Sequence, residues 1–289
     1  MFGISYWFLP LFAGATWLGT SVPLPAPNLT NIPSPPGTLL GMLGDWVANG
    51  SPHYPEMGAN QRIAYISDIG AQYLQPLFIA GSATMVVVFD LAFISERWLR
   101  HKGRLTPTYS KKESILSIGA IVFAIIGAAG LILLSIFDNK NYPNVHDAML
   151  GVFMGGYVLS TIFICAEYQR LGIHFREHRI LRISFWIKLA FIFIEIILGV
   201  SFGATQYTNH YNVSAVLEWI VALIYIFYVW SFIIDFLPAT KTKRPENRFP
   251  KIRRGDDENA LKTQEEGNMT NGPVYSGGGH APNGNSTHF

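Results

Sequence analysis

Two loops of the sequence hold side chains that could do chemistry together. A serine, a histidine and a carboxylate could form a hydrolase, with Ser67 as nucleophile and His146 as base, or a His/Asp set could bind a metal ion. Neither signal is specific, because the chain lacks a nucleophile elbow, paired histidines at metal-ligand spacing and a glycine-rich phosphate loop. We favour helix capping and loop docking over ligand binding, and ligand binding over catalysis. The residues are Tyr65, Ser67 and Asp68 in one loop, and Asp138, His146 and Asp147 in the next.

A second set of ionisable residues lies inside apolar runs, where charges are costly and often functional. Asp90 and Lys188 lie at matched depth, roughly 8 Å from one interface by the helix rise. We expect them to pair or to share a polar network with Glu167 and Asp235, or else to reach the interface separately. Glu195 and Glu218 face no basic residue at their depth, so we expect hydrogen bonds across helices or a site for a lipid head group or a proton. The full set is Asp90, Glu167, Lys188, Glu195, Glu218 and Asp235.

A third set is basic and follows the last apolar run. Clusters of four to eight Lys or Arg beside a membrane span attract anionic lipids, at about 1 kcal/mol per charge. We therefore expect anionic phospholipids as partners, although such charges also fix orientation. Binding of nucleic acid is not expected of a patch tethered to a membrane. The residues are Lys241, Lys243, Arg244, Arg248, Lys251, Arg253 and Arg254.

The elements that position these residues are apolar runs of membrane-spanning length. The chain is 49% hydrophobic and only 14% charged, against about 25% charged in soluble domains. A helix needs about 20 apolar residues to cross a bilayer core. The predicted fold class is an all-α integral membrane protein with six transmembrane helices in one bundle. The runs are Ile4–Thr20, Tyr73–Ser95, Ser114–Phe137, Ala148–Tyr168, Ile183–Gly203 and Val213–Leu237.

Positive charge alternates strictly between the loops. The loops after the second and fourth runs and the segment after the sixth are rich in Lys and Arg, whereas the other loops hold Arg62, Lys140 or none. Basic loops stay in the cytosol, so both termini are predicted to be cytosolic. Residues 1–238 are predicted to form the membrane domain. Residues 239–289 are polar and are predicted to form a disordered cytosolic tail.

One stretch interrupts the pattern. Residues 21–37 read SVPLPAPNLTNIPSPPG, with six prolines, and cannot be helical. One interpretation is a genuine Pro-rich outer loop after a short first span. The other, which we favour slightly, is translated intron sequence, because its removal would fuse Trp17–Thr20 to Thr38–Leu43 and restore one continuous span.

Several motifs resemble the Frag/DRAM/Sfk family. The segment 54–71, YPEMGANQRIAYISDIGA, resembles the family's outer loop, with YISDIG its most diagnostic part. Further matches are Ile136–Asp138 with Val145–Asp147, and Phe163–Arg170. The stretch Phe89–Arg100 is similar to the fungal branch. The resemblance covers residues 1–238 apart from the insert.

This resemblance implies a six-span membrane protein without established enzyme activity, so we expect no catalytic residue, cofactor or metal. Fungal members imply a plasma-membrane protein that supports recruitment of a phosphoinositide 4-kinase complex and lipid organisation. Animal relatives imply autophagy modulation at the lysosome or vacuole, or GPI-anchor lipid remodelling in the Golgi or endoplasmic reticulum by the outer Ser/Asp/His residues. Fold transfers between relatives better than role does.

Overall fold

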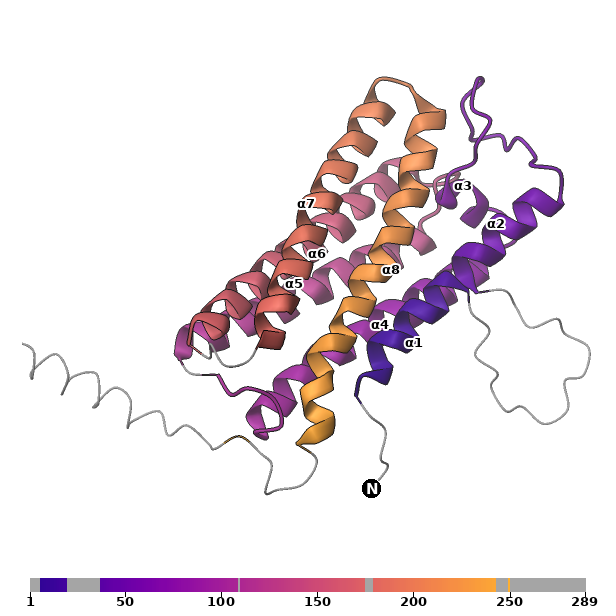
Figure 1. Ribbon diagram of the computed structural model, residues 1–289. Helices are drawn as coiled ribbons and strands as arrows, with labels where there is room; N and C mark the ends of the chain where they lie inside the picture. Colours follow the sequence, from indigo (N-terminus) through magenta and orange to yellow (C-terminus); the bar gives the residue numbers. More distant parts are fainter. Residues whose placement is uncertain (1–5, 20–36, 109, 175–178, 243–248, 250–289) are drawn as a thin grey trace, which may run out of the picture. The chain divides into compact units, whose positions relative to one another are not determined.

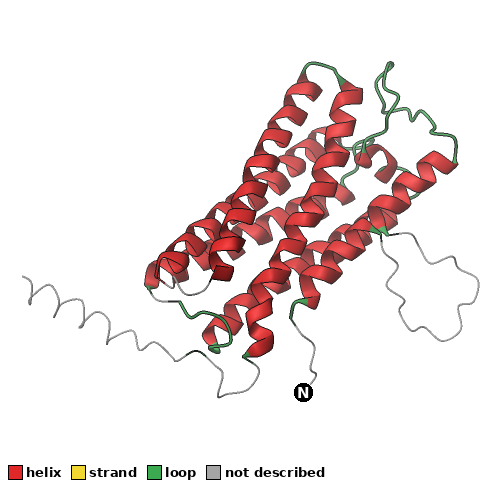
Figure 2. Ribbon diagram, in the orientation of Figure 1, coloured by secondary structure: helices red, strands yellow, loops and turns green. Residues whose placement is uncertain are grey.

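The computed structural model describes residues 6–19, 37–108, 110–174, 179–242 and 249. Within these ranges the secondary structure is helical, with no strand (Figure 2). The predicted all-α class is confirmed for this part. The helices are α1 Phe8–Leu18, α2 Thr38–Ala48, α3 Ile66–Gly70, α4 Gln75–His101, α5 Lys111–Ile136, α6 Pro143–His174, α7 Arg179–Tyr207 and α8 Tyr211–Lys241.

Some predictions lie outside the described residues. These are most of the tail predicted to be disordered (residues 243–248 and 250–289), the insert over residues 20–36, and all of the basic cluster after the last run except Lys241. The first residues of the predicted tail, 239–241, belong to α8 instead, because the last helix runs through Lys241. Only that cluster's first residue, at the end of α8, has a described position.

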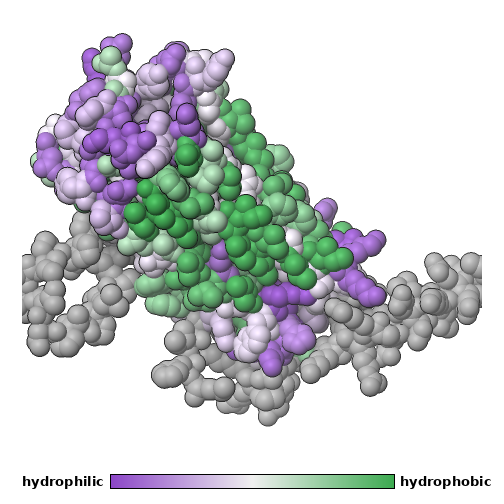
Figure 3. All heavy atoms as spheres, turned by 180° about the vertical axis from the view of Figure 1, so that it is seen from behind, coloured by the Kyte–Doolittle hydropathy of each residue, from purple (hydrophilic) through white to green (hydrophobic). Residues whose placement is uncertain are grey.

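Five helices are long and apolar enough to cross a membrane: α4 to α8. They hold 26 to 32 residues, or about 39–48 Å at 1.5 Å per residue, so each exceeds a hydrocarbon core of about 30 Å. Their outward faces carry large apolar side chains such as Ile115, Phe193 and Val200. Figure 3 shows these faces as a hydrophobic band between two hydrophilic ends.

Two of the three shorter helices, α1 and α2, lie end to end. α1 and α2 have 11 residues each, about 16 Å, which is too short to span alone. The Gly37 N–H donates to the Gly19 carbonyl at 3.2 Å, and the Thr38 hydroxyl donates to the Thr16 carbonyl at 3.2 Å. Figure 1 shows α2 continuing along the line of α1. Within the predicted run Ile4–Thr20, the described helix α1 covers Phe8–Leu18, and α2 continues its line.

The helices form a ring in which sequence neighbours pack together and α8 closes on α1. The tightest pair is α5 with α6, where small residues let the backbones approach. A Cβ added at Gly156 would lie 2.6 Å from Gly127 Cα. Inside the ring, Phe89 packs against the rings of Tyr157, Tyr228 and Phe232. This aromatic core separates the polar groups at one end from those at the other.

Candidate functional site

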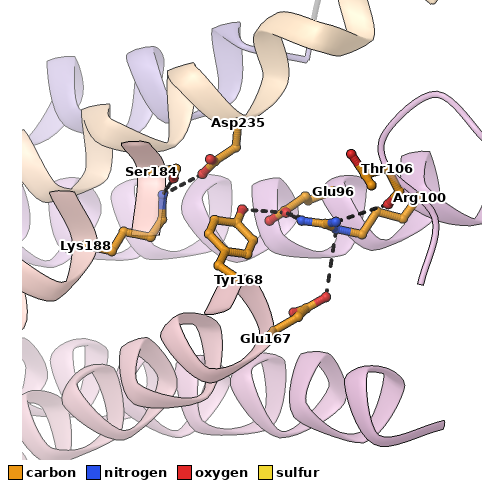
Figure 4. A network of polar contacts seen from close by, with 8 residues as sticks. All are labelled: Glu96, Arg100, Thr106, Glu167, Tyr168, Ser184, Lys188 and Asp235. Carbon is orange, nitrogen blue, oxygen red and sulfur yellow. Dashed lines mark hydrogen bonds and ion pairs between the residues drawn. The ribbon is translucent and has the colours of Figure 1, made fainter. Parts of the chain in front are cut away.

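At one end of the bundle, a lysine and an aspartate form a buried ion pair (Figure 4). Lys188 Nζ on α7 lies 2.6 Å from Asp235 Oδ2 on α8 and also donates to Ser184 Oγ at 2.6 Å. The Lys188 side chain is fully buried, and its ammonium lies 4.0 Å from the centre of the Phe232 ring. The pair ties α7 to α8, and both side chains are buried.

The predicted pairing of Lys188 with Asp90 is wrong, although the network with Asp235 was the stated alternative. Depth along the helices is matched, but α7 packs against α6 and α8, whereas α4 packs against α1 and α5. Lys188 therefore meets a carboxylate on its neighbour α8. Asp90 Oδ1 is buried without a hydrogen-bond partner.

A second buried ion pair lies beside the first. Arg100 Nη2 is 2.7 Å from Glu96 Oε1, and Arg100 Nε is 3.9 Å from Glu167 Oε1 on α6. Tyr168 donates its hydroxyl to Glu96 at 2.7 Å. Figure 4 shows the Tyr168 ring between the two ion pairs, and both cations lie about 5 Å from its centre (5.3 and 5.2 Å).

Sequence reasoning placed Glu167 in the network but missed Glu96, Arg100 and Tyr168. Arg100 was counted with the basic loop, because it lies past the apolar run. The signal that could have found it is the four-residue spacing from Glu96 to Arg100, which places both side chains on one face of a helix.

At the other end, Asp68 anchors the first outer loop. Its Oδ2 accepts hydrogen bonds from Gln61 Nε2 and from the Tyr65 N–H, both at 3.0 Å, and its Oδ1 accepts one from Asn139 Nδ2 at 3.3 Å. The bond from Tyr65 caps α3. Burial raises the pKa of the Asp68 carboxyl above its ordinary value, and burial raises the pKa of Tyr65 to about 12.

The same loop is bound to the start of α8. Glu218 Oε2 accepts the Ile66 N–H at 2.7 Å and lies beside Ser67. Trp219 Nε1 donates to the Ala64 carbonyl at 3.1 Å. Glu218 therefore accepts a hydrogen bond from the loop. Glu195 Oε1, by contrast, accepts no hydrogen bond from any described group. The loop and α8 form one docked unit.

In the second outer loop, Asp138 and His146 bind groups close to them in sequence, while Asn139 reaches Asp68 of the first loop. Asp138 Oδ1 accepts the Asn141 N–H at 2.6 Å. His146 Nδ1 lies 2.9 Å from the Leu134 carbonyl and 3.0 Å from the Phe137 carbonyl, so this nitrogen is the N–H and binds the end of α5. Asp147 is exposed.

The hydrolase arrangement is not assembled in the described residues. No hydrogen bond joins Ser67 to His146. Ser67 lies beside Glu218, and His146 binds carbonyl groups at the end of α5. No group of three or more His, Cys, Asp or Glu within the described ranges could hold a metal ion. The motif residues build two structured loops rather than a nucleophile with its base.

Between these ends the bundle holds a partly open cavity of about 110 Å³. Its lining is almost entirely apolar and aromatic, and it comes from α1 and from α3 to α8. Glu195 and Glu218 both border it. The two carboxyl groups that sequence reasoning placed in the outer halves of their helices thus share one space.

Exposed basic side chains gather at the end that holds the ion pairs. Arg97 and Arg104 are partly buried there, with hydrogen bonds to Ser114 and to the Ala239 carbonyl. At the opposite end the exposed basic residues of the described chain are Arg62 and Lys140. Those at the ion-pair end are Lys102, Lys111, Lys112, Arg170, Arg179, Arg182 and Lys241.

The sequence of this bundle matches a known family. Residues 34–239 match the family described as the Frag1/DRAM/Sfk1/Cwh43P N-terminal domain. The chain belongs to this family. It is similar to Protein sfk1 of Schizosaccharomyces pombe, with 30% identity over 70% of this chain and 60% of that protein. It is also similar to Protein SFK1 of Saccharomyces cerevisiae, with 32% identity over 48% of this chain and 47% of that protein.

The chain thus spans about half to three-fifths of the length of these curated relatives. No solved structure matches it. Together, the Frag1/DRAM/Sfk1 family match and the five apolar helices identify a membrane protein. The matched range contains both ion pairs, both outer loops and α2, and it begins after α1.

Proposed function

We propose that this Sfk1-like chain is a non-enzymatic, six-span regulator of lipid organisation in the plasma membrane, with both termini in the cytosol. In this proposal α1 and α2 together supply the sixth span. The observation that carries it is the asymmetry of exposed charge. Seven exposed Lys and Arg of the described chain lie at one end of the helices and two at the other, the pattern of a cytosolic and an outer face.

The basic end is suited to anionic phospholipids. Lys111 and Lys112 begin α5, and Arg179 and Arg182 lie in the first turn of α7, so these charges stand beside membrane spans. Each basic residue near an anionic surface contributes about 1 kcal/mol to the attraction. Concentrating phosphoinositides here would provide a platform for a phosphoinositide kinase complex, as the family resemblance suggests.

The test compares two pairs of charges. The Lys111→Gln/Lys112→Gln variant removes two charges from the basic end, and Arg62→Gln/Lys140→Gln removes two from the other end. Binding of fluorescent phosphatidylinositol 4-phosphate to the purified full chain in mixed micelles should weaken about tenfold or more in the first variant only. Equal binding by both variants would remove the basis of the proposal.

The lipid-remodelling alternative has no assembled site to support it. His146 has its Nδ1 proton engaged with two carbonyls, and Ser67 lies beside Glu218. We therefore expect Ser67→Ala to leave phosphoinositide binding and cellular activity unchanged. Loss of activity in a Ser67→Ala protein of normal thermal stability would favour the enzyme instead.

A further inference from the structure

Four buried polar atoms on the lining of the cavity inside the helix ring have no hydrogen-bond partner among the described residues: Trp17 Nε1, Tyr157 Oη, Glu195 Oε1 and Tyr225 Oη. Trp17 on α1 and Glu195 on α7 both border the cavity. Trp17 is only 4% exposed. Its Nε1 donor and the Glu195 Oε1 acceptor make no hydrogen bond with any described group. The rest of the lining is dominated by apolar and aromatic side chains.

Unpaired buried polar groups of this kind are rare in native proteins. Leaving one unsatisfied costs about 1–3 kcal/mol, and the hydrocarbon region offers no bulk water to compensate. Ligand sites typically combine an apolar lining with a few polar groups that fix the ligand's orientation. The cavity has this composition, with a free indole donor, a free carboxyl acceptor and two tyrosine hydroxyl groups that can act as either.

We infer that the cavity binds an uncharged lipid alcohol, with its hydroxyl group among the polar atoms and its hydrocarbon chain against the aromatic lining. A hydroxyl group can donate to Glu195 and can also accept from Trp17. A phosphate would meet the carboxyl groups of Glu195 and Glu218. An ammonium group has no acceptor to offer Trp17. This inference rests on the cavity alone and does not depend on the basic end.

The volume of the cavity limits which alcohols can enter it. An apolar cavity of about 150 Å³ takes up benzene, and this one measures about 110 Å³. It therefore holds a small polar end, such as the glycerol group of a diacylglycerol, and not a body of four fused rings. A diacylglycerol or a similar long-chain alcohol from the surrounding bilayer fits this description, whereas a sterol does not.

The experiment uses photoreactive lipids with the full chain in nanodiscs. The probes are a diazirine diacylglycerol, a diazirine phosphatidylcholine with the same chains, and a diazirine sterol. We expect the diacylglycerol alone to label the cavity lining at Phe153, Met154 or Phe191, as read by mass spectrometry of the peptides. The Trp17→Phe/Glu195→Leu variant should lose this labelling about tenfold, because it removes the indole donor and the carboxyl acceptor and leaves only the tyrosine hydroxyl groups.

A volume control separates the cavity from the lipid-facing surface. Ala222 borders the cavity and Ala190 is exposed on α7, so Ala222→Leu should abolish labelling of the lining and Ala190→Leu should not. Equal labelling in all variants would overturn the inference. So would labelling by the sterol or the phosphatidylcholine at the same positions, or a lining that no lipid labels because water alone fills it.

Discussion

Lys188 and Asp235 form an ion pair of 2.6 Å between α7 and α8, with the lysine fully buried. Removing one partner of a buried pair leaves an uncompensated charge, which costs about 3–5 kcal/mol. We therefore expect Lys188→Met and Asp235→Leu each to lower the thermal unfolding temperature of the purified protein strongly. The double variant Lys188→Met/Asp235→Leu should recover most of the loss, because it leaves neither charge behind.

Asp90 provides the control for this pair, since it lies at a similar depth but forms no ion pair with a described residue. Asp90→Asn should change the unfolding temperature little. If Asp90→Asn proved as damaging as Asp235→Leu, the assignment of Asp235 as the partner of Lys188 would be wrong.

The close approach of α5 and α6 gives a second prediction. A Cβ at Gly156 would lie 2.6 Å from both N and Cα of Gly127, which are backbone atoms that cannot move aside. Gly156→Ala should therefore separate the two helices and lower the unfolding temperature. The adjacent Gly155 has no atom within 4 Å of such a Cβ, so Gly155→Ala should be neutral or stabilising. Equal effects at the two positions would contradict this packing.

Asp68 predicts a dependence of stability on pH. Its folded pKa is raised above the ordinary value of 3.8, first by burial and also by Glu56, and Glu218 is a further nearby acid. A raised folded pKa gives stability that is fully present below pH 3.8 and is lost as pH rises through the folded pKa. The difference in unfolding temperature between wild type and Asp68→Asn should therefore shrink as pH rises. If the difference instead grew between pH 4 and pH 8, the pKa of Asp68 would be lowered by folding, and the prediction would be wrong.

The sequence predicts the helices of this protein better than it predicts which residues of the site lie together. Long apolar runs dictate α4 to α8, because lipid leaves the backbone no alternative to helix. The place of Lys188 inside a helical run was also predicted from sequence. Its partner was not, because the order of helices around the ring decides whether α4 or α8 lies beside α7. The cavity and the docking of Ile66 on Glu218 depend on that same packing and leave no local signal.

Asn212 joins the first outer loop to the start of α8, and this gives a fourth prediction. Its Oδ1 accepts the Arg62 and Ile63 N–H groups at 2.6 and 3.1 Å, and its Nδ2 donates to the Asn60 carbonyl at 2.9 Å. Asn212→Ala should release the loop and speed its cleavage in limited proteolysis. Asn60→Ala keeps the carbonyl that accepts this bond, so it should leave the rate unchanged. Equal rates in both variants would show that Asn212 does not hold the loop.

The contacts at the junction of α1 and α2 show how the residues of α2 are aligned with those of α1. In an unbroken helix a threonine hydroxyl bonds to the carbonyl four residues earlier. Thr38 makes this bond to Thr16, so it occupies the position that a residue four places after Thr16 would take. Thr38 is also packed tightly, because a Cβ at Gly81 would clash with its side chain. The two helices are thus placed as if the chain ran directly from Gly19 to Thr38.

Deleting residues 20–37 should therefore fuse α1 and α2 into one helix with the register intact. We expect this variant to fold with an unfolding temperature at or above that of the full chain, since Thr38 would keep its contacts with Thr16 and Gly81. Deleting residues 21–37 instead retains one extra residue, which turns α2 by about 100° relative to α1, and it should be less stable. Sequencing the transcript across these codons tests the intron interpretation directly: a spliced message without them would support it. If the longer deletion failed to fold while the shorter one folded, the register read from Thr38 would be wrong.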